Sequence, residues 1–311
     1  MSGADAEAEV PALAADQRWR TRREKGTVLG VRFMLWLTTL FGRGPARLFL
    51  RVLAFYYTLF SQSARRATYD YLTRVEGRAS FGRAYTQVLR FTQVTLDALF
   101  FLSRKFSPFR ITLTGNHHLE HLRDTKTGAI LLGAHVGSMY AMRAQSGAES
   151  FPIHAVVYTK HAARINEVLE EIDPEGHAKL LQMGEGVDFM LRIKELVEGG
   201  ALVAILADRV GADGRAVEVD FFGAPARFPV GPYILASMLK CPVYLTFGLY
   251  RDPNRYDLFC EPFADAIELP RKRREDALRE YAQRYAARLE HYVRDAPDNW
   301  FNFYEFWGRP S

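Results

Sequence analysis

Several features that mark other protein classes are scarce or absent in this chain of 311 residues. It has two cysteines, Cys241 and Cys260, too few for a disulfide framework or a paired-thiol zinc site. Both stand in apolar, strand-like surroundings, which favours small buried side chains in a reducing compartment. No run of about 18 uncharged apolar residues occurs, so no ordinary membrane-spanning helix is expected. The first ten residues are acidic and lack an apolar core, which is not the pattern of a secretory signal.

The motifs that anchor common enzyme classes are missing as well. There is no Gly-x-Ser-x-Gly elbow, no Walker loop and no Gly-x-Gly-x-x-Gly turn, which disfavours serine hydrolases, nucleotidases and dinucleotide enzymes. The formal net charge is +5, but the basic residues are spread thinly and form no nucleic-acid module. The segment His117-His-Leu-Glu-His121 resembles a metal site only superficially, because it lacks the His-Glu-x-x-His spacing of zinc proteases. No metal is predicted.

What is present is an ordinary globular composition, 48% hydrophobic and 25% charged. Residues 1–16 are rich in Ala and acidic and are predicted to be a mobile tail, followed by a single domain over 17–311. Two apolar helices are expected at 28–41 and 46–60, with Gly42-Arg-Gly-Pro45 between them.

The arginines of these two helices allow two interpretations. Arg32, Arg43, Arg47 and Arg51 interrupt faces rich in aromatic and aliphatic residues. Such helices suit a membrane interface, where guanidinium groups meet lipid phosphates. They suit equally well a pair of core-packing helices with solvated arginines.

A helical N-terminal region is expected to continue through 63–72 and 81–106, and the pattern then changes. Strand-like runs follow at 110–114, 129–132, 153–158, 201–206, 217–221, 243–249 and 256–260. Helical stretches at 139–145, 162–172, 187–198 and 231–239 separate several of them, and a long helix over 273–295 comes last. This alternation predicts an α/β fold with a mixed, largely parallel sheet flanked by helices.

His135 has the most suggestive surroundings of the eight histidines. The buried run 129–132 ends at Gly133-Ala-His135, and Gly137-Ser138 then opens a helix. Ligands of open α/β sheets bind at such strand ends, and the small residues Gly137 and Ser138 are predicted to leave room for a substrate and to contact it. Asp208 and Arg209 follow the strand 201–206 and are expected beside His135. A third group runs from Asp220 through Phe222, Gly223 and Arg227 to a helix start at Gly231, where an anionic group could bind.

The order of these motifs resembles the bacterial lipid A biosynthesis (lauroyl/myristoyl) acyltransferases of the lysophospholipid acyltransferase superfamily. The residues that carry the resemblance are Gly133-Ala-His135-x-Gly137-Ser138, Asp208-Arg209, Phe221-Phe-Gly-Ala-Pro-Ala-Arg-Phe-Pro-Val-Gly-Pro232, Trp19, Glu24, Gly26, Pro297-Asp-Asn-Trp300 and Trp307. It covers roughly residues 19 to 307, and it implies a glycerolipid acyltransferase-like fold.

The resemblance also implies a reaction and a location. An acyl group would pass from acyl carrier protein or coenzyme A, used as co-substrate without a further cofactor, to a lipid or glycolipid acceptor. The place would be the cytoplasmic face of the inner membrane, with the protein held there peripherally. Some single-domain, soluble-looking relatives lack the N-terminal membrane span and act in polyketide or fatty-acid-like pathways that make aryl polyene pigments. This chain resembles them in having no clear span.

One position departs from the family pattern. Family members carry His-x4-Asp/Glu, in which the histidine is the general base and the carboxylate orients its ring. Here Tyr140 holds the acidic position, and a neutral phenol stabilises an imidazolium much less. Either another carboxylate, such as Asp208 or Glu149, replaces it, or the protein is a weakened relative that binds lipids or partners. Lys160 and Arg164 are candidates for the family's basic residue that binds a phosphate or the developing oxyanion.

Overall fold

The computed structural model describes residues 28–148, 151, 153–157, 173, 180–182, 187–211 and 214–308. Its main sheet has seven strands in the order β1-β9-β8-β2-β5-β3-β4. Only the β8–β9 pair is antiparallel. The predicted α/β class with a mixed, mostly parallel sheet is therefore confirmed. The strands are β1 (Arg110–Thr114), β2 (Ala129–Gly133), β3 (Ile153–Val157), β4 (Leu180–Gln182), β5 (Leu202–Leu206), β8 (Val243–Arg251) and β9 (Arg255–Ala264).

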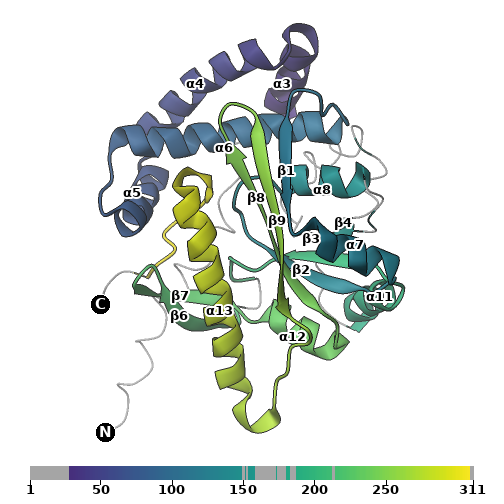
Figure 1. Ribbon diagram of the computed structural model, residues 1–311. Helices are drawn as coiled ribbons and strands as arrows, with labels where there is room; N and C mark the ends of the chain where they lie inside the picture. Colours follow the sequence, from purple (N-terminus) through teal and green to yellow (C-terminus); the bar gives the residue numbers. More distant parts are fainter. Residues whose placement is uncertain are drawn as a thin grey trace, which may run out of the picture.

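Helices cover this sheet and extend beyond one end of it (Figure 1). The N-terminal group comprises α3 (Val28–Phe41), α4 (Arg43–Phe60), α5 (Gln62–Glu76) and α6 (Phe81–Leu102). The others are α7 (Asn116–Asp124), α8 (Met139–Ala148), α11 (Val187–Glu198), α12 (Gly231–Leu239) and α13 (Arg274–Asp295). Short 3-10 turns lie at Arg271–Arg273 and Pro297–Asn299. In Figure 1, α6 passes behind the far end of the β8–β9 hairpin, and α4 lies along α6. The predicted helical N-terminal region is thus confirmed.

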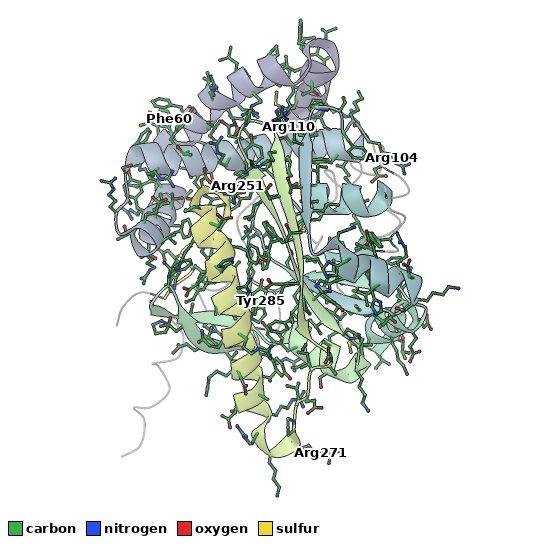
Figure 2. The ribbon with its side chains drawn as sticks, viewed as in Figure 1. Phe60, Arg104, Arg110, Arg251, Arg271 and Tyr285 are labelled. Carbon is green, nitrogen blue, oxygen red and sulfur yellow. The ribbon has the colours of Figure 1, made fainter. Side chains whose placement is uncertain are left out.

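The β2 strand is the central strand of the sheet and lies between β8 and β5. All five residues of β2 are buried, as expected for a central parallel strand with a continuous apolar sequence. The main core cluster lies around them and takes Tyr285, Leu289 and Val293 from one face of α13. Tyr285, labelled in Figure 2, donates its hydroxyl to the Gly133 carbonyl at 2.7 Å. This bond fixes the last residue of β2 to α13.

The segment expected as a Gly/Pro loop after Asp220 is instead a hairpin. β6 (Ala216–Phe221) and β7 (Ala224–Pro229) pair antiparallel in a separate two-stranded sheet. The turn residues Phe222 and Gly223 have φ of 53° and 73°, as a two-residue type I′ turn requires. The prolines of β7 are tolerated because each strand of a two-stranded sheet has an unpaired edge.

The α4 helix packs on the body of the protein through a narrow stripe. Ala46, Leu50, Ala54 and Thr58 repeat every four residues and are buried. Arg43 on the same side forms a bidentate ion pair with Asp97, which is fully buried on α6. Arg47 forms an ion pair with Asp252. These two arginines therefore attach α4 to the rest of the fold.

Candidate functional site

Two neighbouring strands place the central histidine and its carboxylate. β2 and β5 pair in parallel with Gly133 opposite Leu206. His135 lies two residues beyond Gly133, and Asp208 lies two residues beyond Leu206. Because parallel strands end at the same edge of a sheet, the register alone brings residues 73 positions apart together.

The two side chains form a closely bonded pair. Nδ1 of His135 lies 2.8 Å from Oδ1 of Asp208, and the His135 backbone N–H donates to Oδ2 at 3.0 Å. The Asp208 side chain is 1% exposed, whereas that of His135 is 30% exposed. An ionised carboxylate can only accept hydrogen bonds, so Nδ1 carries the hydrogen and Nε2 keeps its lone pair. Among the described residues, Nε2 has no hydrogen-bond partner.

The charges around the pair keep Asp208 ionised and His135 neutral. Burial alone would raise the pKa of Asp208, but attraction to His135, their hydrogen bond, Arg209 and the Trp300 N–H together hold that pKa well below its ordinary value. Burial, followed by the Arg209 charge, lowers the pKa of His135, and Asp208 offsets this only in part. A neutral imidazole with an accessible nitrogen is suited to accept a proton near pH 7.

Arg209 supplies a positive charge next to this pair. One of its terminal nitrogens donates to the Phe301 carbonyl at 3.0 Å, and its guanidinium stacks 5.5 Å from the centre of the Tyr304 ring. These contacts hold the charge at the β5 end, as the sequence led us to expect. Substrate binding by Arg209 stays a prediction.

The loop that carries His135 has a backbone requirement at Gly137. Its φ is +61°, and a Cβ built there would lie 1.9 Å from the Gly248 carbonyl oxygen. The Ser138 N–H donates to that same oxygen at 2.7 Å. Ser138 itself is 1% exposed and its hydroxyl accepts from Ala141 N–H, capping α8. Gly137 and Ser138 thus shape the loop, and contact of either with substrate stays a prediction.

Gly137→Ala is expected to destabilise the protein by more than about 2 kcal/mol, since strain at positive φ adds to a clash with backbone. The measurement is the free energy of unfolding in urea. Gly77→Ala is the matched control: Gly77 has φ +74° but nothing within 4 Å of the added Cβ. Its cost should stay near 1 kcal/mol, about the strain alone. Equal losses in the two variants would contradict the close approach to Gly248.

Tyr140, at the family's acidic position, makes no hydrogen bond or ring contact with His135 within the described part of the chain. Its ring packs with an apolar cluster that includes Phe101, Tyr256 and Phe301. No hydrogen bond joins it to His135. Burial raises the pKa of Tyr140, with Arg143 opposing weakly, so the phenol stays neutral. The carboxylate that is hydrogen-bonded to Nδ1 of His135 is that of Asp208. A catalytic role for Tyr140 stays a prediction without a contact to carry it.

The remaining predicted binding residues either have other hydrogen-bond partners or lie outside the described residues. Phe222 is buried in the β6–β7 turn, where its N–H donates to Glu290 and Arg294 stacks on its ring. Gly223 is exposed in that turn, and Arg227 donates to the Gly214 carbonyl. Binding by these three stays a prediction. Glu149, Lys160, Arg164 and the helix expected at 162–172 lie outside the described residues.

The sequence did not reveal what Trp300 does. Its indole Nε1–H donates to Oδ2 of Asp208 at 3.1 Å. The only signal was its place in a Pro-x-x-Trp segment near the end of the chain, which carries no information on a partner 92 residues away.

No group of three or more metal-binding side chains is assembled in the described part of the chain, and the His117 and His118 rings lie 4.0 Å apart on α7.

Comparison with known proteins agrees with the motif order. A family model described as bacterial lipid A biosynthesis acyltransferase matches residues 16–309. A search of curated proteins finds no match to this chain. The match covers nearly the whole sequence and includes the His135 loop, Asp208-Arg209 and the Trp300 segment. This family implies acyl transfer to a lipid acceptor. The chain therefore belongs to the bacterial lipid A biosynthesis acyltransferase family.

Proposed function

We propose that the protein transfers an acyl group, fatty or polyketide-like, from a thioester of acyl carrier protein or coenzyme A to a hydroxyl of a lipid or glycolipid acceptor. The observation that carries this proposal is the His135–Asp208 pair at the ends of β2 and β5. It pairs the histidine with a carboxylate, although Tyr140 holds the position at which family members carry the acid. The alternative of a weakened relative rested on Tyr140, and the Asp208 contact removes its main support.

In the proposed reaction, Nε2 of His135 removes the proton of the acceptor hydroxyl as the oxygen attacks the thioester carbonyl carbon. An alcohol is a poor nucleophile until that proton is removed. The tetrahedral intermediate then collapses with loss of the C–S bond. The leaving thiolate takes the proton from the imidazolium, so the base is restored. Asp208 stabilises the imidazolium while it exists, and Arg209 is close enough to favour the developing oxyanion.

The direct experiment is detection of the product. Purified protein is incubated with acyl-carrier-protein and coenzyme A thioesters of several chain lengths and with lipid extracts from bacterial membranes. Mass spectrometry should find an acceptor whose mass rises by one acyl group and a stoichiometric release of thiol. His135→Ala serves as the blank. Thiol release without an acylated lipid, or equal product from the blank, would contradict the proposal.

The lowered pKa of His135 gives a pH dependence. The base works only when neutral, so kcat/KM should fall as the pH drops through the pKa of His135. We expect the acidic midpoint below about 6.5, the ordinary histidine value. Initial rates from pH 4.5 to 9 measure it. A midpoint above that value would mean that attraction to Asp208 outweighs burial and Arg209.

The proposal includes a membrane surface as the site of the reaction, on the cytoplasmic face of the inner membrane. In the described part of the chain no helix combines the length and apolar character needed to cross a bilayer. α3 and α4 instead expose many large apolar side chains. These are Phe33, Trp36, Leu40, Phe41, Leu48, Phe49, Val52, Leu53, Phe55, Tyr56, Leu59 and Phe60. We call this set the outer face.

The outer face fits a lipid interface better than solvent. It is contiguous along two packed helices, whereas single exposed apolar residues need no explanation. Arg51 is exposed on α4 within this region and could meet lipid phosphates. Arg43 and Arg47 are not expected to bind lipid phosphates, because they form ion pairs with Asp97 and Asp252. We therefore expect insertion of apolar and aromatic side chains to contribute most of the free energy of membrane binding.

A further inference from the structure

The segment from Pro297 to Phe301, a 3-10 turn followed by an isolated β-bridge residue, is hydrogen-bonded to the loop that carries His135. The Gly137 N–H donates to the Asn299 carbonyl, and the Phe301 N–H donates to the His135 carbonyl, both at 2.9 Å. Val136 and Trp300 thereby form an antiparallel bridge. The backbone on both sides of Val136, directly after His135, is thus held by residues near the other end of the domain.

This segment is itself fixed from three directions. The Asn299 side chain exchanges hydrogen bonds with the backbone of Tyr250 on β8. Gln87 on α6 donates to the Trp300 carbonyl at 2.6 Å. Tyr71 on α5 donates to the Pro297 carbonyl and packs edge-on against the Trp300 ring, 5.1 Å between centres. The position of the indole is therefore determined before any substrate binds.

We propose that Trp300 is a positioning residue for the base: its indole N–H holds Oδ2 of Asp208 so that Oδ1 faces Nδ1 of His135. Asp208 is 1% exposed, and a buried carboxylate needs its remaining lone pairs satisfied. Oδ2 accepts from the His135 N–H and from Trp300, which fixes the rotation of the carboxylate. This inference rests on the proposed function only for its effect on rate.

The bond also has a predictable electrostatic effect. The pair is more negative when His135 is neutral than when it is protonated, so a donor to Asp208 favours the neutral state. Loss of that donor should move the titration of His135 to higher pH. The other charged or titratable groups at the pair are Arg209 and Tyr285, and neither is hydrogen-bonded to the Trp300 side chain.

The chain offers a matched control in Trp307. Its indole N–H also makes one buried hydrogen bond, to the Phe221 carbonyl at 3.0 Å, and its ring belongs to the same aromatic cluster. Trp300→Phe and Trp307→Phe therefore remove similar bonds, of which only one reaches Asp208. We expect Trp300→Phe to lower kcat about 10-fold to 100-fold with little change in KM, as loss of an orienting partner does elsewhere. Trp307→Phe should lower thermal stability and leave kcat and its pH midpoint unchanged.

Nitrogen-15 NMR of the histidine rings provides a readout that needs no substrate. The titration of His135 should move to higher pH in Trp300→Phe and stay in place in Trp307→Phe. If Trp300→Phe does not fold, the indole N–H resonance of Trp300 is observed instead. In the wild type it should follow the His135 titration, and in Asp208→Asn it should appear at a shifted position. An unmoved titration, or an indole resonance indifferent to both, would overturn the inference. Absence of acyl transfer by the wild type would instead count against the proposed function alone.

Discussion

Asp208→Asn should lower kcat about 10²-fold to 10⁴-fold while the protein stays folded, the range that general-base catalysis contributes. An amide keeps the size of the carboxylate but cannot stabilise the imidazolium. Its NH₂ can also turn toward Nδ1 and force the hydrogen onto Nε2, which removes the lone pair that accepts the proton. Steady-state kinetics with the identified donor and acceptor measure the effect, and KM should change little.

Substitutions at Tyr140 are the controls for this result. Tyr140→Phe should keep kcat within about threefold, because the phenol makes no hydrogen bond with His135 and lies in an apolar cluster. Tyr140→Glu, which installs the family's acid, should give no gain and should lose stability through a buried charge. A large gain from Tyr140→Glu together with an active Asp208→Asn would show that the family's position, and not Asp208, governs the base.

Binding to anionic vesicles should fall about 10³-fold when the apolar row along α4 is replaced. Leu48, Val52, Tyr56 and Phe60 repeat every four residues and are each at least 60% exposed. Transfer of the exposed part of each side chain into lipid contributes about 1 kcal/mol, and roughly 4 kcal/mol in sum corresponds to that factor. The measurement is sedimentation of the Leu48→Gln, Val52→Gln, Tyr56→Gln, Phe60→Gln variant with phosphatidylglycerol vesicles.

A matched control removes exposed apolar surface elsewhere. Val187 and Leu191 on α11 and Met238 on α12 are 49–70% exposed and distant in the fold from α4. Their replacement by Gln should leave vesicle binding unchanged. Salt should weaken binding only modestly, because apolar contacts dominate. If wild-type protein ignores vesicles but sediments as a dimer that the α4 variant abolishes, the outer face is an interface between copies of the chain.

Neutralising Arg43 or Arg47 would not test contact between guanidinium groups and lipid phosphates, because both side chains are in ion pairs within the protein. Arg43 is bonded to the fully buried Asp97, so its neutralisation leaves a buried charge unpaired. Reduced vesicle binding by such a variant would report a displaced helix. Arg51, which is exposed on α4, is an informative position for that test.

The sequence by itself determined the alternation of strands and helices and the order of the motifs along the chain. Both depend on local patterns: continuous apolar runs predict buried parallel strands, and glycine after such a run predicts the turn that exposes His135. The strands that the sequence did not predict are also explained by local features. β4 has three residues, too few for a pattern, and the prolines of β7 concealed a strand that pairs only with β6.

Only the tertiary structure decided which carboxylate is hydrogen-bonded to His135. The sequence left Asp208, Glu149 and the loss of activity as alternatives, because spacing along the chain does not give the order of strands in a sheet. That order is set by the packing of the whole domain, which places β5 beside β2 with Gly133 opposite Leu206. The same packing brings Trp300 to Asp208 and Arg43 to Asp97. Hydrogen bonds between residues so distant in sequence exist only once the chain is folded.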